Sequence, residues 1–184
     1  MVEDLCFHLV DLVQNSVAAG ARVIRVQIRE SRASDTLELE VADDGRGMDD
    51  RTLLQAQDPF FTSKGYKKVG LGIPLLKATT EACRGDFAIA SRPGRGTRIR
   101  ASMQRSHLDC PPLGDLEGTL LSLLVSLDAV DLRFSFQGGR GSFAVASAEA
   151  RAHAGDLPLS HPDVYRFLKE FIRSGLGGLL APAP

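Results

Sequence analysis

The sequence predicts an α+β protein, and three patterns in its first 104 residues support that prediction. Apolar residues three and four apart predict a helix over residues 3–19. Two stretches in which apolar and polar residues alternate follow it, joined by a short polar link. A second amphipathic helix then precedes two more alternating stretches, which are joined by a glycine-rich turn. Helices mixed with antiparallel hairpins in this way are typical of an α+β domain.

Composition and charge argue against several classes of function. The chain has 184 residues, 43% of them hydrophobic, which suits one domain or one domain with a small appendage. Its net charge of -1 and its lack of Trp indicate neither a nucleic acid nor an anionic membrane as partner. No stretch approaches the ~20 apolar residues of a membrane span, and no signal peptide is visible at the N-terminus. Three cysteines without C-x-x-C spacing favour reduced thiols. These features predict a cytoplasmic protein.

The first expected helix has an apolar face and a polar strip. Its apolar residues would face a core: Leu5, Leu9, Leu12 and Val13. Its polar residues fall within a narrow angle, because spacings of four and three nearly close one turn: Asp4, His8, Asp11 and Asn15. Such a strip is either a solvated helix face or part of a site. Gly20 is a natural stop for this helix.

Residues 24–28 and 37–41 alternate in the manner of half-buried strands. The link between them is polar and short, so we expect an antiparallel hairpin. Exposed arginines of the first strand would then face exposed glutamates of the second. The second strand leads directly to Asp43 at the edge of the sheet.

The turn after this strand, residues 43–48, reads DDGRGM. Glycine permits positive φ and lets another group approach the backbone closely. An aspartate in front of such a turn can hold a fixed hydrogen-bond acceptor against whatever lies beside it. Turns rich in Asp and Gly also commonly just join strands, so this D-x-G-x-G pattern by itself leaves the plain-turn interpretation open.

A short helix over residues 50–56 and a loop that reads DPFFTSKGYKKVGLG, residues 58–72, come next. The end of this loop opens an amphipathic helix that runs to about Arg84. Glycines at a helix start leave free N–H groups beside the positive end of the helix dipole, which makes an anion site. Two further strands, residues 86–91 and 97–103, are joined by the turn RPGRG.

The order of these features resembles that of the GHKL superfamily, which includes histidine-kinase catalytic domains, gyrase, Bergerat-type heat-shock chaperones and mismatch-repair ATPases. The segments DPFFTSK, GLGIPLLK and SRPGRGT are most similar to a sensor-kinase ATP-binding domain, whereas DLVQNSVAAGA resembles the mismatch-repair version. The resemblance covers residues 1–104. It implies a two-layer α/β sandwich, the Bergerat ATP-binding fold, for a domain of residues 1–108, with ATP and Mg²⁺ as ligands.

The resemblance also implies roles for the matching residues at the adenine and metal. Asn15 would be a ligand of Mg²⁺, and an amide carbonyl is a suitable hard oxygen ligand. Asp43 would accept a hydrogen bond from the exocyclic amine of adenine, which favours ATP over GTP. Gly45 and Gly47 would let the base and ribose approach the turn, and Thr97 would lie at the adenine end.

The phosphates would be bound by the lysine loop and the glycine-rich helix start. Lys64 would meet terminal phosphate oxygens as a point charge. A solvated loop lysine remains the alternative for Lys64 and for the two lysines that follow it. The backbone amides of Gly70 and Gly72, together with Leu71 between them, would wrap the phosphates.

Asp11 stands where the hydrolytic and anti-sigma members of the superfamily carry a glutamate that acts as general base. A carboxylate is the right type of group to orient a water or a hydroxyl. Asp is one methylene shorter than Glu, and a misplacement of about 1 Å can lower a rate by on the order of a hundredfold. The resemblance therefore predicts ATP binding and leaves turnover open. We expect His8 to be a helix-surface or packing residue rather than a phosphoacceptor.

Residues 109–184 carry no recognisable chemistry, and we expect them to form a small α+β appendage. After a linker with two prolines, the pattern predicts a helix over 116–127, a hairpin with strands at 132–136 and 143–145, and two further helices. Residues 157–176 resemble small ATP-binding proteins encoded beside hydrogenase or NADH-dehydrogenase-like subunits. This appendage, or the short lid before Gly70, would bind a protein partner.

Two functions from different classes follow from the resemblance. One is an Mg·ATP-binding protein that hydrolyses ATP slowly or transfers its phosphoryl group to a partner protein, with Asp11 as the base; whether it acts as an ATPase or a protein kinase is left open. The other is a non-catalytic ATP sensor, a regulatory subunit of a larger complex such as a redox enzyme, in which ATP orders the lid. A clamp-type ATPase that dimerises on nucleotide is a third possibility.

Overall fold

The computed structural model describes residues 4–59 and 71–180 of the chain. Helices and strands are mixed along the chain, as the sequence patterns predict. The elements are α1 (Leu5–Ala18), β1 (Val23–Ser31), β2 (Thr36–Asp43), α2 (Asp50–Gln55), α3 (Gly72–Ala82), β3 (Asp86–Ser91), β4 (Thr97–Gln104), α4 (Leu116–Ser126), β5 (Asp131–Gly138), β6 (Gly141–Ala146), α5 (Ser147–Ala154) and α6 (Pro162–Leu180).

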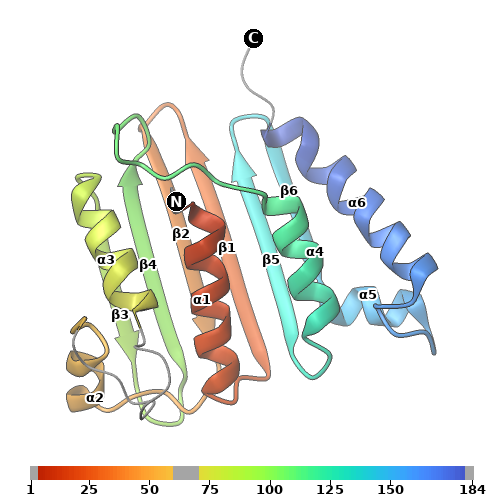
Figure 1. Ribbon diagram of the computed structural model, residues 1–184, viewed down its shortest axis with the longest axis horizontal. Helices are drawn as coiled ribbons and strands as arrows, with labels where there is room; N and C mark the ends of the chain where they lie inside the picture. The colour runs from red at the N-terminus through yellow and green to blue at the C-terminus, as the bar shows by residue number, and fades with distance from the viewer. Residues whose placement is uncertain (1–3, 60–70, 181–184) are drawn as a thin grey trace.

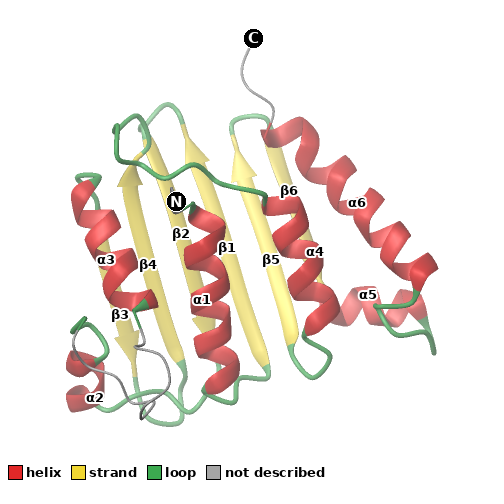
Figure 2. Cartoon of the chain, viewed as in Figure 1, coloured by secondary structure: helices red, strands yellow, loops and turns green. Residues whose placement is uncertain are grey.

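The six strands form one sheet in the order β3-β4-β2-β1-β5-β6. Neighbouring strands are antiparallel except for β1 and β5, which are parallel. Helices α3, α1 and α4 lie next to one another over one face of the sheet (Figures 1 and 2). The α+β class and the two-layer α/β sandwich expected from the sequence are confirmed.

The alternation within β1 and β2 gives the sheet an apolar inner face and a charged outer face. The inward residues of both strands are buried: Ile24, Val26, Ile28, Leu37, Leu39 and Val41. On the outer face Arg29 of β1 donates to Glu38, its paired residue on β2, at 2.8 Å. Arg100 of β4 binds the same carboxylate. The predicted facing of arginines and glutamates across the hairpin is present, and it extends to a third strand.

Residues 109–184, which the sequence suggests as an appendage, extend the sheet of the first half. β5 pairs with β1 along most of its length, and β6 pairs with β5. One hydrophobic cluster contains buried residues from both halves, including Leu12 of α1, Leu124 of α4 and Phe136 of β5. The division of the chain at residue 108 stays a prediction. The helices within residues 4–59 and 71–180 include none long and apolar enough to cross a membrane.

Phe136→Ala should lower the free energy of unfolding by about 3–5 kcal/mol, because it empties a fully buried position in the shared core. Urea unfolding followed by circular dichroism measures this change. The control is Gln137→Ala at the exposed neighbouring position, with an expected change within about 0.5 kcal/mol. Because both halves share one core, Phe136→Ala should still unfold in one transition. A separate early transition that leaves residues 1–108 folded would contradict a shared core.

Candidate functional site

Asp43, the last residue of β2, lies where three segments meet. Its Oδ1 accepts hydrogen bonds from the backbone N–H groups of Gly45 at 2.8 Å and Thr97 at 3.2 Å. Its Oδ2 accepts a hydrogen bond from the hydroxyl of Ser16 on α1 at 2.9 Å. The carboxylate therefore joins the turn after β2, the start of β4 and α1, and three donors fix its orientation. The structure thus brings the predicted Asp43, Gly45 and Thr97 together.

The neighbouring Asp44 binds a different segment of the chain. Its Oδ1 accepts hydrogen bonds from the backbone N–H groups of Arg22 at 2.7 Å and Val23 at 2.8 Å. These bonds, the one from Val23 foremost, hold the pKa of the Asp44 carboxyl below its usual value. Asp44 thus fastens the turn to the start of β1, while Asp43 is the carboxylate at the junction with β4.

Two glycines allow the turn after β2 to pack directly against the turn between β3 and β4. Gly47 has a φ of +66°, and a Cβ there would lie 1.9 Å from the carbonyl oxygen of Arg92. Gly96 has a φ of +77°, and a Cβ there would lie 1.8 Å from the carbonyl oxygen of Asp43. Real Cβ atoms do not approach backbone oxygens so closely. A side chain at either position would force the two turns apart.

Sequence reasoning missed two hydroxyl residues of this junction. Ser16 supplies the donor to Asp43 Oδ2 described above. Ser91, at the end of β3, accepts a hydrogen bond from the N–H of Met48 at 2.8 Å and lies 2.9 Å from Thr97 Oγ1. Ser91 could have been found from the sequence, because it is the first residue of the motif SRPGRGT. Ser16 follows the predicted Asn15 directly, but nothing in the sequence indicated that it faces Asp43.

Asp11 on α1 lies against the start of α3. A Cβ built on Gly72, the first residue of α3, would lie 3.0 Å from Asp11 Cβ and 3.2 Å from Asp11 Oδ2. Asn15 follows Asp11 by one helical turn on α1, and its side chain is half-buried. No side-chain hydrogen bond caps α3 at Leu71. The first N–H groups of an α-helix have no partner within the helix, and α3 begins at Gly72, next to the carboxylate of Asp11.

His8 is a packing residue. Its side chain is fully buried, and Nε2 lies 3.5 Å from Thr79 Oγ1 of α3. Its ring packs edge-on against Phe7 with centroids 5.8 Å apart. Of the two alternatives that the sequence left for this residue, the structure selects packing between α1 and α3.

The loop expected to bind the phosphates lies outside the described residues. Lys64 and Gly70 both fall within residues 60–70, as do Lys67 and Lys68. The roles expected for these residues stay predictions.

The protein offers Mg²⁺ a small set of donors. Within the described ranges, no group of three His, Cys, Asp or Glu side chains could hold a metal ion. Mg²⁺ commonly takes only one or two protein ligands and completes its shell with waters and phosphate oxygens. The amide of Asn15, the ligand expected from the sequence, fits that pattern of a metal held jointly by protein and nucleotide.

A protein-family model identifies the family of this chain. The family described as "Histidine kinase-, DNA gyrase B-, and HSP90-like ATPase" matches residues 2–107, more than half of the chain. The chain belongs to this family. It therefore contains an ATP-binding domain of the histidine-kinase-like type, and the GHKL resemblance seen in the motifs is confirmed.

Several relatives with similar sequences carry the names of sensor kinases or sensor proteins. The sensor protein kinase FleS of Pseudomonas aeruginosa is 39% identical over 89 residues, which cover 48% of this chain and 22% of FleS. The sensor protein DegM of a Bacillus species is 30% identical over 95 residues, which cover 52% of this chain and 25% of DegM. The sensor histidine kinase YxdK of Bacillus subtilis is 29% identical over 103 residues, which cover 53% of this chain and 32% of YxdK. This chain spans less than a third of the length of each.

A solved structure, the crystal structure of the N-terminal domain of a DNA repair protein, aligns with 78% of this chain and 51% of its own, with a TM-score of 0.45 and 13% identity.

Gly96→Ala should abolish measurable ATP binding, because its Cβ would meet the carbonyl oxygen of Asp43 and separate the two turns. Binding of a fluorescent ATP analogue measures this loss. The matched control is Gly94→Ala in the same turn. Gly94 also has a positive φ, +70°, but a Cβ there meets nothing within 4 Å. The control should therefore lose only about 1 kcal/mol of stability and keep its affinity for ATP. Equal loss of binding in both variants would show that close packing of the turns is not what the site requires.

Proposed function

We propose that this protein binds Mg·ATP and acts as a phosphotransferase of the GHKL type, hydrolysing ATP slowly or passing its terminal phosphoryl group to a partner protein. The observation that supports this most is the contact between Asp11 and Gly72. It sets a carboxylate beside the N-terminal end of α3, and the N-terminus of a helix is a natural phosphate position. A candidate general base and a candidate phosphate site are thus adjacent.

Adenine recognition would use the second oxygen of Asp43. A carboxylate oxygen has about two acceptor sites. Oδ1 already accepts from two backbone N–H groups, whereas Oδ2 accepts from Ser16 alone among the described residues. Oδ2 therefore has a lone pair to accept the exocyclic amine of adenine. Guanine presents a carbonyl oxygen at that place, and a carboxylate cannot donate to it, so the site should prefer ATP.

The phosphoryl group would be held mainly by charge and position, which is what phosphoryl transfer requires. Asn15 would hold Mg²⁺, which neutralises charge on the phosphate oxygens when it is bound. Lys64 and the amides of Gly70 and Gly72 would add positive charge and donors. Asp11 would accept the proton from the attacking water, or from the hydroxyl or imidazole of a phosphoacceptor. A water nucleophile gives slow hydrolysis, and a side-chain nucleophile gives a phosphorylated partner.

The relatives support a protein partner for this site. FleS, DegM and YxdK carry the names of sensor kinases or sensor proteins, and each is much longer than this chain. We infer that this protein acts on or with a partner bound at the lid or at the C-terminal half, in the cytoplasm where ATP is available.

The Asp11 contact also favours a second function, that of a non-catalytic ATP sensor. Asp is shorter than Glu, and the Asp11 side chain lies next to Gly72 at the start of α3. Binding of a nucleotide would then move α3, and a partner protein would recognise the changed position of α3 without any chemical reaction.

Asp43→Asn should weaken ATP binding by about ten- to a hundredfold, because an amide places donors opposite other donors and removes a charged hydrogen bond worth roughly 1.5–3 kcal/mol. Isothermal titration with ATP measures this change, and Asp44→Asn is the matched control. Among the described residues, the Asp44 side chain accepts hydrogen bonds from Arg22 and Val23 at the start of β1, so its variant should keep the affinity for ATP. Wild-type affinity in Asp43→Asn would show that Asp43 does not recognise adenine.

Asp11→Asn should bind Mg·ATP as wild type does and lose phosphate release, because it keeps the size of the side chain and removes the base. Phosphate release at saturating nucleotide measures this. Turnover in the wild type that disappears in the variant supports the enzyme. Tight binding without turnover in either protein, with or without a partner, would instead favour the sensor.

A further inference from the structure

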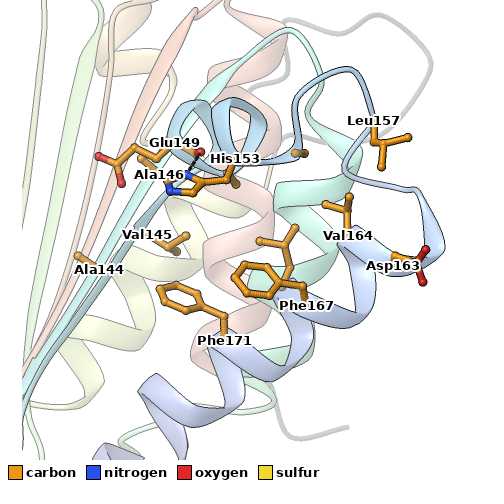
Figure 3. A pocket seen from close by; sticks show the side chains of 13 residues that line it. Ala144, Val145, Ala146, Glu149, His153, Leu157, Asp163, Val164, Phe167 and Phe171 are labelled. Atoms are coloured by element: carbon orange, nitrogen blue, oxygen red, sulfur yellow. Dashed lines mark hydrogen bonds between the residues drawn. The ribbon is translucent and has the colours of Figure 1, made fainter.

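A groove of about 490 Å³ lies between β6, α5 and α6, at the end of the sheet away from β3 and β4 (Figures 1 and 3). Its lining is mostly apolar. Phe167 and Phe171 of α6 stand along it with their rings nearly parallel, at 14°, and their centroids 6.3 Å apart. Their side chains are 60% and 43% exposed. Exposed aromatic side chains gathered along a groove are typical of a protein-binding surface.

The groove runs along an unpaired sheet edge. β6 is the last strand of the sheet, and in the described part of the chain it pairs only with β5. A two-residue turn closes this hairpin at the pair Gly138–Gly141. Hydrogen-bonded and non-hydrogen-bonded pairs alternate from that closing pair. The N–H and C=O groups of Ser142 and Ala144 therefore point away from β5. Ala144 and the two residues after it line the groove.

The strand at this edge lacks the residues that commonly prevent pairing. β6 reads GSFAVA, without a charged residue or a proline. Natural edge strands commonly carry lysine, proline or a bulge to prevent the addition of another strand. α6 lies beyond β6 in the direction in which a next strand would be placed (Figure 1). Its exposed aromatic side chains would cover the inner face of such a strand.

We propose that β6 accepts an extended segment of a partner protein as a seventh strand. Its outward backbone groups would supply the hydrogen bonds, and alternate apolar side chains of the segment would pack against Phe167 and Phe171. The charged residues that line the groove are Glu149 and Asp163, with no Lys or Arg among the lining residues. Asp163 already lies 3.5 Å from Arg166 of α6, so the segment should carry Lys or Arg chiefly near Glu149.

A second copy of this chain fits the edge poorly. Two copies paired through β6 about a two-fold axis would each bring α6 over the other's β6, so two helices would compete for one place in the helical layer. The same symmetry would bring the two acidic linings towards each other. A segment without its own covering helix, and with basic residues, fits better.

The test uses the whole protein and a phage-displayed library of random 12-residue peptides. Enriched peptides should alternate apolar and polar residues and include Lys or Arg. A Trp-labelled copy of an enriched peptide can be followed by fluorescence, because the protein contains no Trp. Amide exchange by NMR should show slower exchange at Ser142 and Ala144 in the complex. Addition of Mg·ATP is not required, so this result does not depend on the proposed ATP chemistry.

Three variants and one control locate the binding. Phe167→Ser should weaken the peptide by about tenfold or more, as loss of an interface aromatic does. Ala144→Pro should do the same, because it removes an outward N–H at an edge where proline is tolerated. Glu149→Lys should weaken peptides that carry Lys or Arg and spare neutral ones. The control, Leu108→Ser, changes an apolar side chain that is 96% exposed and lies outside the groove, and it should bind as wild type does.

Other outcomes would overturn the proposal. A library without enriched peptides, or peptides that bind Phe167→Ser as tightly as wild type, would show that the groove does not take a peptide strand. Apolar residues at helical spacing, without protection of Ser142 and Ala144, would indicate a helix in the groove instead. A wild-type dimer that Ala144→Pro dissociates would assign the edge to a second copy. Displacement of the peptide by a small amphiphile, without any effect of Ala144→Pro, would indicate a small-molecule site.

Discussion

The geometry of the proposed ATP site depends on one carboxylate. Asp43 ends β2, and its two oxygens accept from Ser16 on α1, from Gly45 in the following turn and from Thr97 at the start of β4. A charged acceptor with three donors keeps a single orientation, because rotation would break all three bonds. The helical layer and the sheet are thus tied together at the point where the nucleotide is expected. Among the described residues, these bonds leave one acceptor position of Oδ2 open.

Local periodicity was enough to predict α1, the β1–β2 hairpin and the glycine turns, because each of these has a pattern within a few residues. Asp43 and Gly72 were predicted through motifs whose spacing the fold requires. The contacts between distant segments could not be predicted in the same way. Ser16, Ser91 and the attachment of Asp44 to β1 depend on which turns meet in space. The burial of His8 depends on where α3 crosses α1.

In the C-terminal half, too, the contacts between distant segments could not be predicted from local sequence patterns. Its helices and its hairpin follow from alternation, but pairing of β5 with β1 leaves no local signal. The family match ends at residue 107, whereas the sheet and the core continue through β6. The ATP site and the groove beside β6 consequently belong to one continuous sheet. Asp43 lies on β2 and the groove lies beside β6, so strands β1 and β5 separate the two proposed sites.

The parallel pairing of β1 and β5 has a consequence for synthesis on the ribosome. β1 lies in the middle of the finished sheet, but its neighbour on one side is made much later than its neighbour on the other. Until β5 emerges, the nascent chain carries an open apolar strand edge next to a half-covered core. Contacts between residues so distant in sequence form slowly, and intermediates of this kind are prone to aggregate. Synthesis of β5, rather than completion of the nucleotide site, would then decide when the sheet can close over this edge of β1.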